Sequence, residues 1–355
     1  MNDLWNLSWE AEALYRARVR GCLLGGALGD ALGYPVEFDS LDRIRAAHGP
    51  RGVSGPVPDT DGVVGRISDD TQMTLFTVEG LQQAHARERL KGIGGGWSRL
   101  VRWAYGRWLD TQTEPGPGPD VHGGLAAQTW LYARRAPGNA CLSGLQQDHF
   151  PDPMSELGLP GPVNPDSKGC GAVMRSAPFG LTRAPAETVF GMAARCAQTT
   201  HGHPTGYYAS GALAAIVAHL VSGDSLEGAV LRALRLLASH PGHEETAAAL
   251  NRALDLASED APTAEKVESL GAGWIAEEAL AIAVYCALAA PRVTDALLLS
   301  VNHSGDSDST GAICGNLLGA RHGDHGLPQE WLERIEGRST ITLLADDFAT
   351  ECVRR

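Results

Sequence analysis

Two short stretches of the sequence crowd carboxylates together among small hydroxyl residues. One reads SDDT and begins at Ser68, and the other reads GDSDS and begins at Gly305. Adjacent carboxylates repel one another unless a cation neutralises them. Hard cations such as Mg²⁺ and Mn²⁺ prefer oxygen ligands from carboxylates, hydroxyls and water. Four carboxylates could hold two such ions, and the candidate ligands are Ser68, Asp69, Asp70, Asp306, Asp308 and Ser309.

Both stretches also have a simpler interpretation as helix N-termini. A Ser or Asp at the cap accepts hydrogen bonds from free N–H groups, and an Asp in the first turn suits the helix dipole. Ser68 before one expected helix, and Ser307 or Asp308 before another, would fit that role. A cap needs only one carboxylate, however, and each stretch holds two. Because no His or Cys is interleaved among these acids, zinc and redox metals fit them less well.

A third stretch, GCLLGGALGDALGYPVEF at 21–38, combines small residues with two more acids. Its glycines recur every three or four positions, which lets two helices approach closely. Asp30 lies on the expected helix, and Pro35 ends that helix before Glu37. Glu37 could project into a cleft or lie on the surface, and the sequence alone leaves both interpretations open.

Helices are the elements that must position these acids, because most of the apolar periodicity is helical. Alternating Val, Ile and Thr runs are almost absent, so the expected fold class is all-α. Pro, Gly and Asp mark two long functional loops, at 39–67 and 137–169. The expected helices lie near 11–33, 69–86, 98–111, 123–135, 186–199, 204–222, 225–239, 244–258, 274–290, 293–301, 308–321, 328–336 and 340–353.

Composition narrows the class of protein. The 355 residues, with 43% hydrophobic and 20% charged side chains, are typical of a globular protein, and no linker divides them. The net charge of −13 argues against sequence-independent binding to nucleic acid. The 7 scattered cysteines predict reduced thiols in a cytoplasm. The amino-terminal segment lacks a secretory signal pattern, and no apolar run is long enough to span a membrane.

Five blocks of the chain resemble the ADP-ribosylglycohydrolase family. In order along the chain, they lie at 21–38, 68–73, 164–180, 200–204 and 305–320. The resemblance runs nearly end to end, and it implies a single compact orthogonal multi-helix domain over 1–355, which we expect to be a monomer. It also implies two Mg²⁺ ions, or Mn²⁺, at the bottom of a cleft, where they bind the distal ribose of ADP-ribose.

The resemblance assigns roles to individual residues. It makes the six hydroxyl and carboxylate residues of the two acidic stretches the metal ligands. The family usually has Thr where this chain has Ser68 and Ser309, so the ligating oxygens remain while a stiffening methyl group is lost. Glu37 matches a glutamate near the scissile bond. The resemblance leaves the choice of base open between Glu37, Asp70 and Asp306.

A second group of residues is implied to bind the substrate. Backbone N–H groups of the loop containing Ser167, Gly169, Cys170 and Gly171 would cradle the diphosphate. Some relatives carry Asn in place of Cys170, so a side-chain hydrogen bond to the ligand could be lost here. His201 falls on a family histidine near the phosphates, although a core histidine is the alternative. Asp120 is the last candidate for substrate binding. It ranks second because His122 replaces a glycine that the family has two positions later.

The implied reaction is hydrolysis of the glycosidic bond between ADP-ribose and a modified target. An arginine-linked ADP-ribosylated protein is the first candidate substrate, and serine-, nucleobase- or small-molecule-linked ADP-ribose are alternatives. Two-metal phosphoryl hydrolysis could use the same ligand types, but it would not need the 164–180 loop. The scaffold also occurs in non-enzymatic members, which tend to lose the metal acids, whereas this chain keeps all four.

Overall fold

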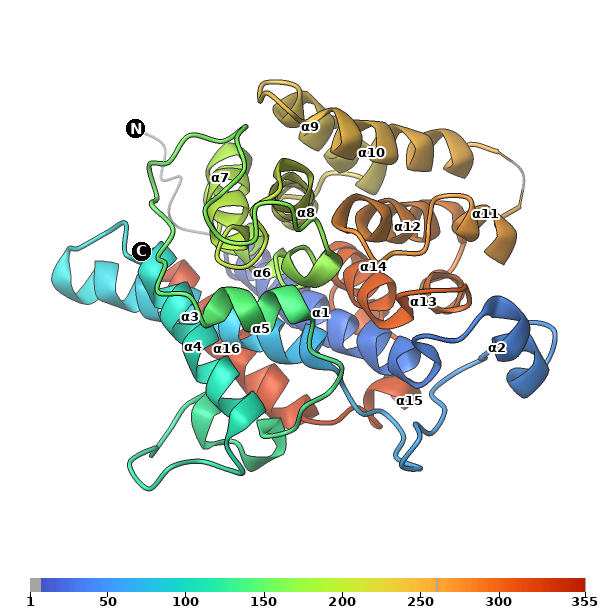
Figure 1. Ribbon diagram of the computed structural model, residues 1–355, viewed down its shortest axis with the longest axis horizontal. Coiled ribbons are helices and arrows are strands. Elements are labelled where there is room, and N and C mark those ends of the chain that lie inside the picture. The colour runs from blue at the N-terminus through green and yellow to red at the C-terminus, as the bar shows by residue number, and fades with distance from the viewer. Residues whose placement is uncertain (1–7, 260, 355) are drawn as a thin grey trace.

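Helices form almost all the regular structure of the protein, and the longest of them, α1, runs through its middle (Figure 1). The computed structural model describes residues 8–259 and 261–354. Residues 1–7, 260 and 355 lie outside these ranges. The first seven belong to the segment expected to carry no secretory signal, and all nine belong to the expected domain 1–355. Within the described ranges no strand forms, and two isolated bridges are the only β pairing. The prediction of an all-α fold is confirmed.

The α-helices follow one another along the whole chain. In its first part they are α1 (Trp9–Gly33), α2 (Leu41–His48), α3 (Asp69–Lys91), α4 (Trp97–Thr113), α5 (Asn139–Leu145), α6 (Ala177–Gly180), α7 (Ala186–Ala197) and α8 (Pro204–Val221). In its second part they are α9 (Leu226–Leu237), α10 (Glu244–Ala257), α11 (Ala264–Glu268), α12 (Ala276–Ala289), α13 (Val293–Val301), α14 (Ser307–His322), α15 (Gln329–Leu332) and α16 (Arg338–Val353). Short 3₁₀ helices are η1 (Tyr34–Val36), η2 (Leu125–Ala127), η3 (Thr129–Leu131), η4 (Cys170–Ala172) and η5 (Asp324–Gly326).

Most of the expected helices are present, but the one near 123–135 is wrong. The chain there forms only η2 and η3, and Gly124 before them has a φ of 68°. The Leu125 N–H donates to the Glu79 carboxylate at 3.0 Å, so it is held by α3 rather than by a helix of its own. Glycine readily adopts this left-handed conformation, which breaks a helical run.

The two expected loops contain helices that the apolar pattern did not indicate. Helix α2 lies within 39–67, where the Ser40 hydroxyl caps it by accepting from the Arg43 N–H at 3.3 Å. Helix α5 lies within 137–169. Both are short, so they carry too few apolar residues to show a period. The rest of each loop is irregular. Helices α9 and α10 lie along one edge of the molecule (Figure 1), where Lys168 of the second loop pairs with Glu245 of α10 at 2.7 Å.

Helices α1 and α14 pack antiparallel with their backbones almost in contact. A methyl group added at Gly29 would lie 1.8 Å from the Gly311 carbonyl oxygen, and one at Gly25 would lie 2.3 Å from that of Gly315. One turn further, a methyl group at Gly21 would lie 2.4 Å from the carbonyl oxygen of Gly319. The contact therefore requires glycine on both helices, and it brings the C-terminal end of α1 beside the N-terminal end of α14.

None of the described helices combines the length and the hydropathy needed to cross a bilayer. All seven cysteines are free thiols, and six of them are buried.

Candidate metal and substrate site

The N-termini of α3 and α14 bring the two acidic stretches together. The Ser68 hydroxyl caps α3 by accepting from the Asp70 N–H at 3.2 Å, and the Asp306 carboxylate caps α14 by accepting from the Ser309 N–H at 3.3 Å. Capping is therefore real in both stretches, with Asp306 rather than Ser307 or Asp308 as the second cap. It leaves the other carboxylates available for a different task.

Carboxylates from three segments of the chain line a single cavity of about 750 Å³. Oxygen atoms of Glu37, Asp306 and Asp308 lie within 4.8 Å of one another, and Asp69 and Asp70 line the same cavity. The four aspartates are each no more than 3% exposed. The fold therefore concentrates five acids around one cavity, and four of them are almost fully buried.

Burial and mutual repulsion make these groups hard to ionise together. Burial, followed by the charge of Asp308, raises the pKa of Asp70 and of Asp306 well above the usual range. The same two causes, with the charge of Asp306, raise the pKa of Glu37 to about 11. Without a cation the cluster therefore holds protons at neutral pH.

The cluster fits a hard divalent cation. Asp70 Oδ1 and Glu37 Oε2 are buried and have no hydrogen-bond partner. Within residues 8–259 and 261–354, none of the five carboxylates forms an ion pair with Lys, Arg or His. Buried unpaired carboxylate oxygens are costly, and coordination to Mg²⁺ or Mn²⁺ would satisfy them.

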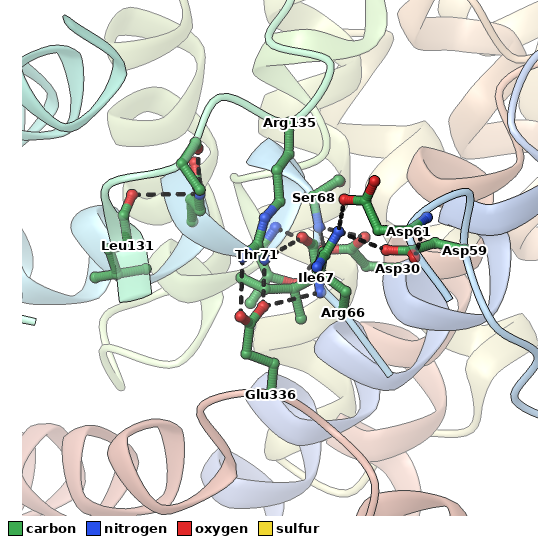
Figure 2. Close-up of polar contacts among 12 residues, drawn as sticks. Asp30, Asp59, Asp61, Arg66, Ile67, Ser68, Thr71, Leu131, Arg135 and Glu336 are labelled. Atoms are coloured by element: carbon green, nitrogen blue, oxygen red, sulfur yellow. Dashed lines mark hydrogen bonds and ion pairs between the residues drawn. The ribbon is translucent and has the colours of Figure 1, made fainter. Parts of the chain in front are cut away.

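Asp30 of α1 fixes the start of α3 (Figure 2). Its fully buried carboxylate accepts from the Ser68 N–H at 2.9 Å, from the Thr71 N–H at 3.1 Å and from the Thr71 hydroxyl at 2.5 Å. Burial, and then the charge of Asp308, nevertheless raises the pKa of Asp30 to about 7. A side chain of α1 thus sets where the acids of α3 point.

Arg135 ties a separate segment to the same helix start (Figure 2). Its guanidinium donates to the Ile67 carbonyl at 2.8 Å and pairs with the Glu336 carboxylate through both terminal nitrogens. Its own carbonyl accepts from the Asp69 N–H at 3.2 Å. The α3 end of the site is therefore held from both sides.

The loop at 167–171 forms another wall of the cavity. Its backbone is fixed to the segment before α12, because the Cys170 N–H donates to the Trp274 carbonyl at 3.1 Å. The Ser167 N–H is also engaged, with the Asn164 carbonyl at 2.9 Å. Those two amides are therefore not free to cradle a diphosphate, and the role would fall to other N–H groups of this loop, such as those of Gly169 and Gly171.

The Cys170 side chain points at the acids. Its thiol donates to Asp306 Oδ2 at 2.7 Å. Burial and the charge of Asp306 raise the pKa of this thiol well above its usual value, so the group stays protonated beside the carboxylates.

His201 lies behind the loop and also lines the cavity. Its ring is only 2% exposed, and its Nδ1 lies 2.7 Å from the Thr200 hydroxyl oxygen. Burial, and then the charge of Arg175, lowers the pKa of His201 to about 3, so the imidazole is neutral. It can share a hydrogen bond with a ligand, but it brings no positive charge to phosphates.

Most of the candidate residues from the sequence therefore meet in one place. Two do not line the cavity: Ser68 is fully buried at its cap position, and Asp120 is exposed on the irregular segment after α4. Nine lining residues were not among the candidates, namely Phe38, Arg134, Ala136, Pro137, Gly138, Asn139, Ala140, Met174 and Trp274. Position next to Glu37 could have drawn attention to Phe38, whereas no sequence signal pointed to Arg134 or Trp274.

Comparisons with known proteins show which family and which fold the chain resembles. A model of the ADP-ribosylglycohydrolase family matches residues 11–355. The ADP-ribosyl-(dinitrogen reductase) glycohydrolase of Rhodospirillum rubrum is 25% identical over 326 residues, covering 90% of each chain. The ADP-ribosylarginine hydrolase Tri1 of Serratia proteamaculans is 25% identical over 340 residues, covering 96% of this chain and 80% of the relative. A solved structure described as an ADP-ribosylglycohydrolase-related protein complex matches this chain with a TM-score of 0.67 at 22% sequence identity. The match covers 96% of this chain and 99% of the chain in that structure, so the two share a fold.

Proposed function

Because the chain belongs to the ADP-ribosylglycohydrolase family, we propose that it is an enzyme that hydrolyses the glycosidic bond between ADP-ribose and a modified target. The observation that carries this proposal is the cluster of Glu37, Asp306 and Asp308 at a cavity of about 750 Å³, next to two further aspartates. An arginine-linked ADP-ribosylated protein is the first candidate substrate, since one relative is named an ADP-ribosylarginine hydrolase.

Two divalent ions, Mg²⁺ or Mn²⁺, would be held by the six residues expected from the sequence, of which five line the cavity and Ser68 caps α3 directly before Asp69. The unpartnered oxygen of Asp70 and the low exposure of all four aspartates support this assignment. When bound, the ions would fix the ribose diol and lower the pKa of a water molecule. The ligands are Ser68, Asp69, Asp70, Asp306, Asp308 and Ser309.

Glu37 is the proposed base. Its unpartnered Oε2 would accept a proton from the water that attacks C1 of the distal ribose. The bond from C1 to the acceptor atom breaks, and the acceptor leaves with a proton. Asp70 and Asp306 are the alternative bases, although both would also be metal ligands.

The remaining predicted residues would bind the ADP-ribose. Gly169 and Gly171 would offer backbone N–H groups to the diphosphate, beside Ser167 and Cys170 on the same wall, and His201 would share a hydrogen bond. This built wall favours an ADP-ribose conjugate over a simple phosphate ester. It also favours an enzyme over a non-enzymatic member of the family, because the acids are kept.

Direct assay tests the proposal. The protein in Mg²⁺ is incubated separately with arginine-, serine- and nucleobase-linked ADP-ribose, and the release of free ADP-ribose is measured. Release from at least one conjugate, and fastest from the arginine-linked one, is expected. Binding of ADP-ribose without release from any conjugate would favour the non-enzymatic alternative.

A further inference from the structure

Two aromatic side chains stand exposed on the wall of the acidic cavity. Phe38 is 66% exposed and Trp274 is 40% exposed, although both are large apolar residues. Their rings stack on each other, with centroids 5.2 Å apart and planes inclined by 23°. They come from segments far apart in the chain, one after η1 and one before α12, and both line the cavity.

The backbone fixes the position of both rings, and at Phe38 its conformation is strained. Phe38 has a φ of 70°, in the left-handed region that a bulky side chain rarely adopts. Such strain persists where the surroundings impose it, and it collects at ligand sites. The Trp274 carbonyl accepts from the Cys170 N–H, so the backbone that carries the second ring is anchored to the loop at 167–171.

The charges around the pair favour a cation. Phe38 directly follows Glu37, whose carboxylate belongs to the cluster with Asp306 and Asp308. The whole chain carries a net charge of −13. An aromatic face attracts a cation through its quadrupole, and a guanidinium, being planar and weakly hydrated, is the cation that stacks best on such a face. Arg134 lines the cavity from a different segment, and its charge suits the diphosphate.

We propose that the stacked pair of Phe38 and Trp274 is the recognition surface for a guanidinium acceptor, the arginine side chain to which ADP-ribose is linked. This inference rests on the proposed function and names its specificity residues. A serine hydroxyl offers neither a planar face nor a charge, so it would gain nothing from the pair. The surface thereby distinguishes arginine-linked from serine-linked substrates.

Binding of a small probe tests the surface independently of hydrolysis. Methylguanidinium is titrated into the Mg²⁺-loaded protein by calorimetry, with neutral methylurea as the matched probe. Saturable binding of methylguanidinium alone is expected, and Trp274→Ala and Phe38→Gly should weaken it about ten-fold. Phe38→Gly removes the ring while relieving the strained φ, so its fold should survive, and thermal melting checks this.

Two further variants serve as controls. Trp274→Phe keeps an aromatic face and should bind methylguanidinium nearly as well as the unchanged protein. Trp103 is 48% exposed and contacts Phe150 outside the cavity, so Trp103→Ala should have no effect. Unweakened binding in folded Trp274→Ala and Phe38→Gly, or equal binding of methylurea, would overturn the proposal.

Hydrolysis supplies the second readout. The KM for arginine-linked ADP-ribose should rise about ten-fold in Trp274→Ala, with a smaller change in kcat, because the ring binds the acceptor and takes no part in the chemical step. An unchanged KM would contradict the assignment, and so would a rise confined to nucleobase-linked ADP-ribose. If the unchanged protein released ADP-ribose from no conjugate, the proposed function would fail, while the methylguanidinium titration would still decide whether the pair binds a guanidinium.

Discussion

Single side chains at this site perform more than one task. Asp306 caps α14, accepts the Cys170 thiol hydrogen and contributes to the acidic cluster. Ser68 caps α3 while its own N–H donates to Asp30. Such overlap means that a substitution must be chosen to remove one role and keep the others.

Glu37→Gln removes charge while keeping size. The variant should bind ADP-ribose in Mg²⁺ about as well as the unchanged protein, and its turnover should fall by about 10²–10⁴-fold, as expected for the loss of a general base. Calorimetry with ADP-ribose and a turnover assay separate binding from chemistry. If turnover stayed the same, the base would have to be Asp70 or Asp306.

Asp306→Asn and Asp308→Asn test metal ligation against capping. Asn is as good a cap as Asp, so α14 should form and the melting temperature should change little. Metal binding, measured by calorimetry with Mn²⁺, should be lost in each variant. A variant that binds Mn²⁺ normally but unfolds readily would show that the acid serves the helix alone.

At the scale of elements, the glycine contact between α1 and α14 decides where the acids lie. It places the segment that ends in Glu37 beside the first turn of α14, and Asp30 of α1 then orients α3. The site therefore forms where the ends of three helices meet, and no single helix end carries all of its acids.

Gly29→Ala should test this contact. The added methyl group would lie 1.8 Å from the Gly311 carbonyl oxygen, and backbone cannot move aside cheaply, so we expect the free energy of unfolding to fall by at least about 2 kcal/mol. Gly106→Ala is the matched control, because a methyl group there meets only the end of the Arg102 side chain at 3.8 Å. It should be neutral or stabilise α4 by up to about 1 kcal/mol. Equal stabilities in urea unfolding would contradict this view of the contact.

The sequence allowed the acids to be identified but not their surroundings. Asp69 and Asp308 could be found because a pair of acids among hydroxyls is a local pattern. Trp274 could not, because its place at the cavity depends on a backbone pairing with Cys170, which lies far away in the chain. The role of Asp30 was hidden for the same reason. The helix wrongly expected near 123–135 shows the opposite error, since a long-range contact overrode a local pattern.

For the whole molecule, the acidic cluster links stability to pH. The pKa of Asp30 is raised to about 7, against about 4 in an unfolded chain. The folded state then binds more protons than the unfolded state between these values, so stability falls as pH rises from about 4 to about 7. The melting temperature of the metal-free protein should therefore be higher at pH 5 than at pH 7.5. In Asp308→Asn, which removes a charge that raises this pKa, the difference should shrink, and an equally large difference there would contradict the assignment.

Chelation and metal addition test the same cluster. EDTA should abolish ADP-ribose release, and Mg²⁺ or Mn²⁺ should restore it. The ions should also raise the melting temperature, because they bind the folded state and offset carboxylate repulsion. Full activity after exhaustive chelation would contradict the two-metal assignment.

The α1–α14 contact also has a consequence for synthesis on the ribosome. The Asn316 side chain of α14 bonds the Cys22 carbonyl of α1 across 294 residues of sequence. The glycine face of α1 is therefore made about 294 residues before its partner face on α14. Contacts of such long range form slowly, so the acids of α3 and α14 meet only after α14 has been made, and a growing chain that lacks α14 has no assembled site with which to act.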